Sequence, residues 1–152
     1  MSIFICNFEL VDHDGDGVYV AYPAGLGGAT EGHGYVDAVE MAADWLRETA
    51  LDFLMRGEEW PELPLDAKPT RGGSMITVAV DASLDQIPAM TAAEAARTLG
   101  VSTARVAQLC KAELLESWKV GGTRMVSVDS VESRLADRCG AERTREEDLV
   151  PA

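Results

Sequence analysis

Residues 91–128 read TAAEAARTLGVSTARVAQLCKAELLESWKVGGTRMVSV, and this stretch decides the fold of the second half of the chain. Thr91 lies three residues before Glu94, which is the spacing of a capping box at the start of a helix. Small residues follow, and Gly100 predicts a left-handed stop to that helix. The stretch therefore begins with a short capped helix that ends in a tight glycine turn.

A second helix is predicted from Thr103 to Ala112, with Ser102 as its N-terminal cap. Helical spacing turns Val106, Leu109 and Cys110 inward and a polar set outward. The outward residues are Thr103, Arg105, Gln108 and Lys111. Arginine, glutamine and lysine are the residue types that read purine edges or clamp phosphates. We therefore expect this helix, with Ser102 at its start, to contact double-stranded DNA.

A β-hairpin is predicted around Gly121-Gly122, because two glycines suit a two-residue turn between alternating strands. As a wing, this hairpin would carry a further set of contacts to an adjacent groove or phosphate row. These are Lys119, Gly122, Thr123 and Arg124. The alternative left open by the pattern is a small helical domain that makes protein contacts only.

This segment resembles the excisionase and MerR-like winged-helix domains. The residues that carry the resemblance are Thr91-Ala92-Ala93-Glu94-Ala95-Ala96, Leu99-Gly100-Val101-Ser102 and Val120-Gly121-Gly122-Thr123-Arg124. That family usually places a glycine between the second helix and the wing, and Glu113 occupies this place here. Either Glu113 takes a strained positive φ or the turn is remodelled.

The domain boundaries follow from composition. A linker is predicted over residues 85–90, where Pro88 disfavours helix. The DNA-binding domain then spans 91–139, and its last helix, from Ser130 to Arg138, is capped by Asp129. Residues 140–152 are charged and poor in apolar residues, so a flexible tail is expected there.

The net charge of −13 is unevenly spread. Residues 1–89 contain 4 Lys+Arg and 16 Asp+Glu and carry −12, whereas residues 90–128 contain 5 and 3 and carry +2. An acidic front half would repel phosphate and attract basic partners, so the DNA contact is expected in the second half only.

The first half, residues 1–84, reads as an antiparallel sheet with one long helix. Strands are predicted over Ile3 to Val11, Val18 to Tyr22 and Ser74 to Asp81, with a short one near Thr30. The helix is predicted from Tyr35 to Arg56, with one apolar stripe, and Gly57 ends it.

The candidates for chemistry in this half are few. His13 lies in a turn and His33 in a loop, with no serine or cysteine beside either. Asp12 to Gly17 opens like a calcium loop, but Pro23 falls where the bidentate acid belongs, so a hairpin turn is the preferred interpretation. The thiols of Cys6, Cys110 and Cys139 are expected to be free, as in the cytoplasm. No transmembrane helix, cofactor, metal or enzymatic activity is expected.

The first half resembles the N-terminal domain of the HicB antitoxins. The matching run is Tyr22-Pro23-Ala24-Gly25-Leu26-Gly27-Gly28-Ala29-Thr30-Glu31-Gly32, followed by Ala38, Ala42, Pro61 and Pro64; Ala24 stands where the family has aspartate. The resemblance implies a partial ribonuclease H-like fold without nuclease activity. It also implies a basic, RNA-cleaving toxin of the HicA type as partner.

The expected fold is thus α+β, with a small antiparallel sheet and one long helix followed by a winged helix-turn-helix. Two functions remain open. The first is an antitoxin that neutralises its toxin and represses its own operon, bound to a palindromic operator as a homodimer or higher even oligomer. The second is a stand-alone transcriptional regulator or excisionase-like factor with no toxin partner.

Overall fold

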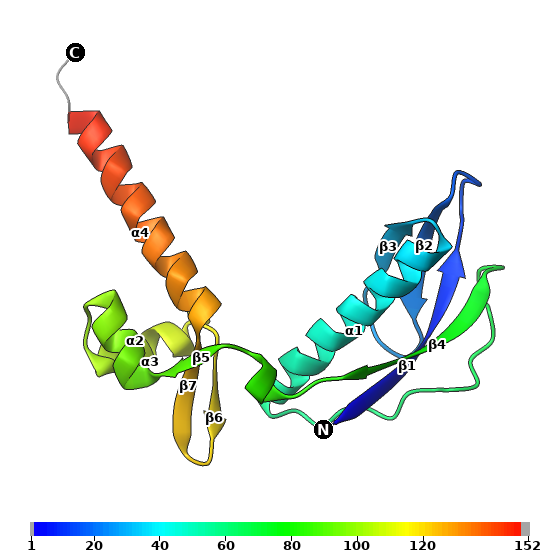
Figure 1. The fold of residues 1–152 in the computed structure, drawn as a ribbon, viewed down its shortest axis with the longest axis horizontal. Coiled ribbons are helices and arrows are strands. Elements are labelled where there is room, and N and C mark those ends of the chain that lie inside the picture. The colour runs from blue at the N-terminus through cyan, green and yellow to red at the C-terminus, as the bar shows by residue number, and fades with distance from the viewer. Residues whose placement is uncertain (1, 150–152) are drawn as a thin grey trace. The chain divides into compact units, whose positions relative to one another are not determined.

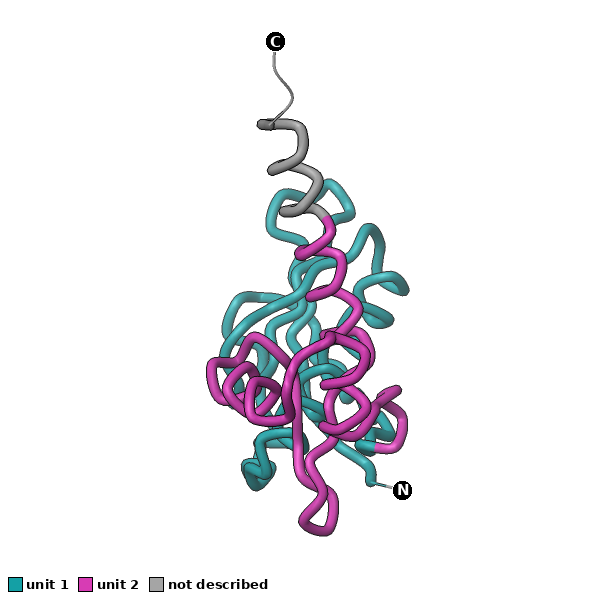
Figure 2. The backbone as a smooth tube through the Cα atoms, turned by 90° about the vertical axis from the view of Figure 1, so that its left-hand side faces the viewer, with its two compact units in different colours: residues 1–84 teal, residues 85–152 magenta. Residues whose placement is uncertain are grey.

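The computed structural model describes residues 2–149, with side chains described for residues 2–139. The chain divides into two compact units, residues 1–84 (unit 1) and residues 85–152 (unit 2), coloured separately in Figure 2. Both units combine helices with an antiparallel sheet. Within the described part of the chain, no helix combines the length and the apolar character needed to cross a membrane.

Unit 1 is a four-stranded sheet in the order β3-β2-β1-β4, with one long helix (Figure 1). The strands are β1 (Ile3–Val11), β2 (Val18–Pro23), β3 (Thr30–His33) and β4 (Ser74–Asp81). Every pairing is antiparallel, and β1 pairs with β4 over eight residues. The predicted strands are confirmed, and the short third strand extends to His33.

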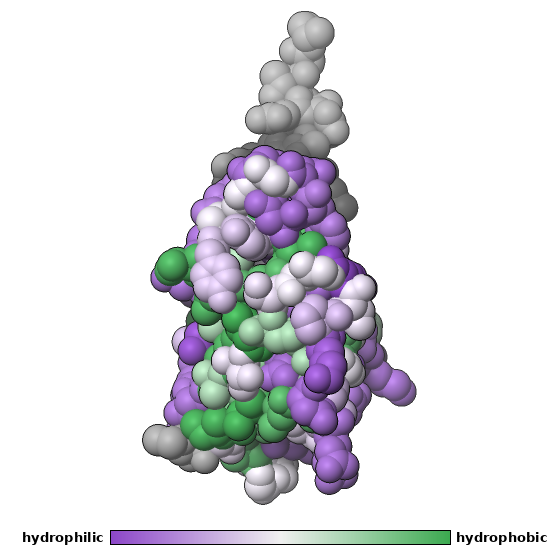
Figure 3. Space-filling model, turned by 90° about the vertical axis from the view of Figure 1, so that its right-hand side faces the viewer, coloured by the Kyte–Doolittle hydropathy of each residue, from purple (hydrophilic) through white to green (hydrophobic). Residues whose placement is uncertain are grey.

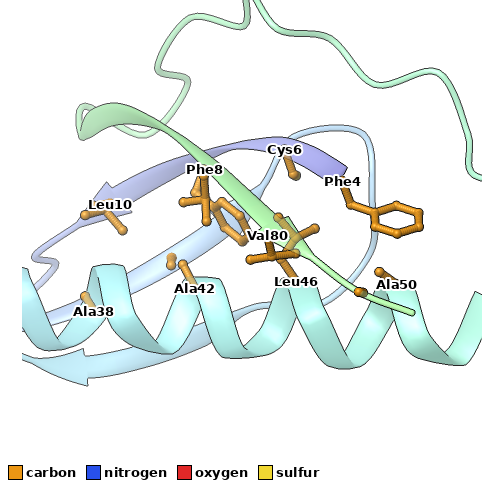
Figure 4. Close-up of a cluster of buried hydrophobic side chains, with 12 residues drawn as sticks. Phe4, Cys6, Phe8, Leu10, Ala38, Ala42, Leu46, Ala50 and Val80 are labelled. Carbon is orange, nitrogen blue, oxygen red and sulfur yellow. The ribbon is translucent and has the colours of Figure 1, made fainter. Parts of the chain in front are cut away.

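Helix α1 (Tyr35–Arg56) has the predicted bounds and covers one face of this sheet. Small alanines on its buried side allow a close approach to the sheet, and Figure 4 shows them facing the side chains of β1. The facing residues include Phe4, Cys6, Phe8 and Leu10 from β1 and Ala38, Ala42, Leu46 and Ala50 from α1. The helix ends at Gly57, whose φ of 67° is the predicted left-handed stop.

The approach of β3 to α1 is closest at Gly32. A Cβ atom at this position would lie 2.4 Å from the backbone nitrogen of Ala38, well inside van der Waals contact. Only glycine fits there, so Gly32 sets how tightly the start of α1 packs on the sheet.

The segment between α1 and β4 is held to the sheet by a buried carboxylate. Glu9 of β1 is 4% exposed, and it accepts hydrogen bonds from the backbone N–H groups of Thr70, Arg71 and Gly73. Burial acts to raise the pKa of this carboxyl, but the hydrogen bonds outweigh it and hold the pKa below its ordinary value of 4.5. Glu9 is therefore a structural anion of unit 1.

A short 3-10 helix, Leu84–Gln86, includes the last residue of unit 1 and the first two residues of unit 2. The elements of unit 2 then are β5 (Ala89–Thr91), α2 (Ala92–Leu99), α3 (Thr103–Lys111), β6 (Ser117–Val120), β7 (Thr123–Ser127) and α4 (Val128–Leu149). The strands form a sheet in the order β5-β7-β6. The prediction of a linker over 85–90 is wrong at its end, because Ala89 and Met90 pair with Ser127 and Val126.

Helix α4 also differs from the prediction. It begins at Val128, and Ser127 rather than Asp129 caps it, since the Ser127 hydroxyl accepts the N–H of Ser130 at 3.2 Å. The helix continues past Arg138 to Leu149, through residues that were predicted to form a flexible tail. Alanine, glutamate and arginine follow Gly140, and these are good helix formers that need no apolar face. The flexibility of this end stays a prediction, and residues 150–152 lie outside the described residues.

Candidate nucleic-acid interface

Helix α2 starts and stops where its sequence predicts. The Thr91 hydroxyl accepts the N–H of Glu94 at 3.2 Å, which is the capping bond expected from their spacing. At the other end, Gly100 has a φ of 68°, and the N–H of Val101 bonds to the carbonyl of Ala96. These bonds make the turn into α3 a fixed corner.

Helix α3 presents the predicted polar face. Ser102 caps the helix by accepting the N–H of Arg105 at 3.1 Å. Val106 and Leu109 are buried in the core of unit 2, while the predicted contact residues of the helix are exposed. The exposed residues are Ser102, Thr103, Arg105, Gln108 and Lys111. The side chains available to a ligand on α3 are therefore hydroxyl, guanidinium, amide and ammonium groups.

The side chains of Arg105 and Gln108 are joined by a hydrogen bond. Nη1 of Arg105 donates to Oε1 of Gln108 at 3.3 Å. The bond leaves the NH2 group of Gln108 and the other guanidinium N–H groups of Arg105 available as donors. The pair is thus oriented before any ligand arrives, which lowers the entropy lost on binding.

The turn after α3 resolves the question raised by Glu113. This residue has a φ of 61°, so it takes the left-handed conformation in the place where glycine was expected. The N–H of Glu113 donates to the carbonyl of Cys110 at 3.1 Å, and the N–H of Leu114 donates to the carbonyl of Leu109 at 2.9 Å. This is the Schellman pattern that glycine normally completes. The turn is kept, and the strain is carried by Glu113.

The hairpin β6–β7 turns on Gly121 and Gly122, whose φ values of 56° and 88° are both positive, as a tight primed turn requires. Lys119 pairs directly with Arg124 across the strands. Two cations opposite each other repel in water, so they favour an anion beside them. Nη1 of Arg124 donates to the Ser117 hydroxyl at 2.8 Å, which fixes part of this group in place.

The structure thus places every predicted contact residue in unit 2, in two regions: helix α3 with its cap, and the β6–β7 hairpin. Ser102 to Lys111 belong to α3 and its cap, and Lys119, Gly122, Thr123 and Arg124 belong to the hairpin. Lys119, Gly122 and Thr123 are exposed and Arg124 is half-buried. Their contact with DNA stays a prediction.

Sequence reasoning missed two arginines of α4. Arg134 and Arg138 lie four residues apart, so they share one side of the helix. Nη1 of Arg138 donates to the carbonyl of Leu99 at 2.6 Å, at the end of α2. The sequence signal that could have found them is their helical spacing relative to the buried Val131 and the partly buried Leu135, which places both arginines beside the core.

The candidates for chemistry in unit 1 are a histidine and a buried thiol. Nε2 of His13 lies 2.7 Å from the Tyr22 hydroxyl. Burial raises the pKa of the Cys6 thiol to about 11, so the thiol stays protonated at neutral pH. Among the described residues, no group of three or more histidine, cysteine, aspartate or glutamate side chains is placed to hold a metal ion.

The surface of unit 1 carries both charged and apolar groups. Glu40, Asp44 and Glu48 on α1 are exposed. Ile3 of β1 is 55% exposed and Ile5 is 38% exposed. On the face of the molecule displayed in Figure 3, hydrophobic side chains gather in patches between hydrophilic ones.

Comparison with known proteins identifies the class of unit 2. The family of helix-turn-helix domains matches residues 89–139, which include β5, the two capped helices, the hairpin and the start of α4. A solved structure described as a toxin–antitoxin complex from Streptococcus pneumoniae is similar to the chain, with 19% identity and a TM-score of 0.43. The similarity covers 74% of this chain and 97% of that one. A comparison with curated proteins gives no significant match.

Proposed function

We propose that the chain is a sequence-specific DNA-binding regulator that also serves as the antitoxin of a toxin–antitoxin pair. The observation that carries the first part is the helix-turn-helix of residues 89–139, with both helices capped and the outer face of α3 polar. In this motif the second helix enters the major groove and its side chains contact base edges. Gln108 and Lys111 are the residues of α3 suited to that reading.

The hairpin β6–β7 is proposed to act as a wing. Lys119 and Arg124 face each other across its strands, and a phosphate row would relieve their repulsion. Residues 90–128 carry a net charge of only +2, so a single copy neutralises few phosphates. Two copies on a palindromic operator would double both the phosphate contacts and the bases read, and we therefore propose a homodimer or higher even oligomer.

The antitoxin role is proposed for unit 1. Its support is the net charge of −12 over residues 1–89 and the resemblance of the run from Tyr22 to Gly32 to HicB antitoxins. An acidic domain attracts a basic protein and speeds their association. The proposed partner is a basic, RNA-cleaving toxin of the HicA type. Unit 1 would inhibit this toxin by binding it in the cytoplasm, and no catalytic step by unit 1 is involved.

DNA reading is tested with Gln108→Ala. The full chain is first used to select its preferred duplex from a random pool. Gln108→Ala should then lose about 1–3 kcal/mol of discrimination between the selected duplex and a scrambled one, because an amide that pairs with a base edge is removed. Thr98→Ala on α2 is the matched control, since Thr98 is exposed and its hydroxyl donates to the carbonyl of Glu94 within the same helix. Equal discrimination by all three proteins would refute the assignment of Gln108 as a base-reading residue.

The antitoxin role is tested with the protein encoded beside this gene. A basic neighbour should bind the full chain and lose its ability to cleave RNA. The double variant Glu40→Gln/Glu48→Gln should slow the association at low salt, whereas Glu132→Gln in unit 2 should not. A chain that binds its selected duplex but leaves the neighbour unbound and active would instead be a stand-alone regulator or excisionase-like factor.

A further inference from the structure

Unit 2 has a hollow of about 190 Å³ beside the turn from α2 to α3. Its apolar wall is made by Leu99, Val101 and Leu109. The rest of the lining is three arginines, Arg105 from α3 and Arg134 and Arg138 from α4. A small hollow with one apolar side and three guanidinium groups has the composition of an anion site.

The charge in this hollow is unbalanced. Among residues 2–139, whose side chains the structure describes, no carboxylate lines it, and none of the ion pairs found there involves any of its three arginines. Three positive charges around one small space repel one another, and this repulsion is stronger beside an apolar wall than in open water. A bound anion would remove the repulsion.

The guanidinium groups have hydrogen-bond donors to spare. Each carries five N–H donors. Arg138 uses one nitrogen on the carbonyl of Leu99, and Arg105 uses one on Gln108. Each of these bonds orients a side chain that lines the hollow. A planar fork of free N–H groups matches the geometry of phosphate oxygens.

The hollow is tied to the reading helix through Arg105. Arg105 and Leu109 are four residues apart, so they lie on the same side of α3. Val101 lies in the turn just before that helix. Gln108, which Arg105 contacts, belongs to the exposed face of the same helix. A helix in the major groove has a row of phosphates along each of its sides.

We propose that this hollow binds a phosphate of the DNA backbone, with Arg134 and Arg138 of α4 as contacts beyond those of α3 and the hairpin. The inference rests on the proposed DNA binding and adds α4 to the interface. A DNA phosphate is favoured over a carboxylate of a protein partner because Arg105 belongs to both the hollow and the polar face of α3. Arg105 then positions the protein on the duplex through the phosphate, and Gln108 and Lys111 contact the base edges.

The test uses Arg134→Gln in the full chain, because Arg138 also ties α4 to α2. The probe is a short mixed-sequence DNA duplex, and its affinity is measured by fluorescence anisotropy from about 50 to about 200 mM KCl. Loss of one phosphate contact should reduce the slope of log K against log salt by about 0.9. Arg134→Lys should restore most of the slope, because lysine binds phosphate as a point charge.

Arg47→Gln is the matched control, since it removes the same charge from an exposed position on α1 of unit 1. It should leave the slope unchanged. If Arg134→Gln keeps the wild-type slope while the wild-type protein binds the duplex, the phosphate site is wrong and the proposed function stands. If the wild-type protein does not bind duplex DNA at any salt concentration, both are wrong.

Discussion

Replacing Glu113 by glycine should stabilise unit 2. Glu113 is the only residue other than glycine with a positive φ among those the structure describes, and its value of 61° lies in the left-handed region. A side chain costs about 1–2 kcal/mol in that conformation, whereas glycine adopts it freely. Glycine also gains freedom in the unfolded chain, which takes back about 0.5–1 kcal/mol. The net expectation for Glu113→Gly is a gain of about 0.5–1 kcal/mol.

Hydrogen exchange is the assay that isolates this effect, because it reports the opening of individual segments. The amides of α3 and β6 flank the turn and belong to unit 2. A gain of about 0.5–1 kcal/mol should slow their exchange roughly two- to five-fold under conditions where opening is at equilibrium. The amides of β1 in unit 1 supply the internal reference.

Glu113→Ala is the matched control. It removes the same carboxylate but keeps a Cβ atom at the left-handed position, so the strain remains. Its α3 amides should exchange about as fast as those of the wild-type protein. If Glu113→Ala slows exchange as much as Glu113→Gly does, the effect comes from the charge and the argument from backbone strain is refuted.

Three further predictions concern caps, core and charge. Ser102→Ala should cost unit 2 about 1 kcal/mol, because the first turn of α3 loses the acceptor for the N–H of Arg105; urea unfolding checks this, and an unchanged midpoint would contradict it. Leu46→Ala should destabilise unit 1 by about 2–5 kcal/mol, since Leu46 is fully buried between α1 and the sheet; a smaller loss would show that the core collapses around the cavity. The lowered pKa of Glu9 means that its stabilising contribution is present above pH 4.5 and is lost as pH falls through the lower pKa of the folded state. Glu9→Gln should therefore lower the urea midpoint of unit 1 at pH 7 and reduce its dependence on pH below 4.5; equal acid sensitivity of the two proteins would show that other groups dominate.

The parts of the fold that were predicted from sequence are those set by local chemistry. Helix α1 matches its prediction at both ends, because a regular apolar stripe and a C-terminal glycine define it. The caps at Thr91 and Ser102 and the stop at Gly100 follow from hydrogen bonds within four residues. Such features need no knowledge of the rest of the chain.

The parts that were missed depend on residues far apart in sequence. Strand β5 is three residues long and exists because β7 lies beside it, about 35 positions later in the chain. The arginine hollow depends on a hydrogen bond from Arg138 to the carbonyl of Leu99, which lies 39 residues earlier in the chain. The conformation of Glu113 was left as two alternatives, because sequence alone does not say whether a Schellman turn tolerates the strain of a side chain.

Strand β5 also determines how unit 2 could be studied as a separate fragment. The helix-turn-helix pattern begins at Thr91, but a recombinant polypeptide starting there would lack Ala89 and Met90, which cover one side of β7. It would also lose the carbonyl of Pro88, which accepts the N–H of Val128 at 3.0 Å where α4 begins. The uncovered strand would then present open N–H and C=O groups, which invite pairing between molecules and precipitation. Expression of this unit alone should therefore start no later than Leu84, so that both ends of its small sheet are present.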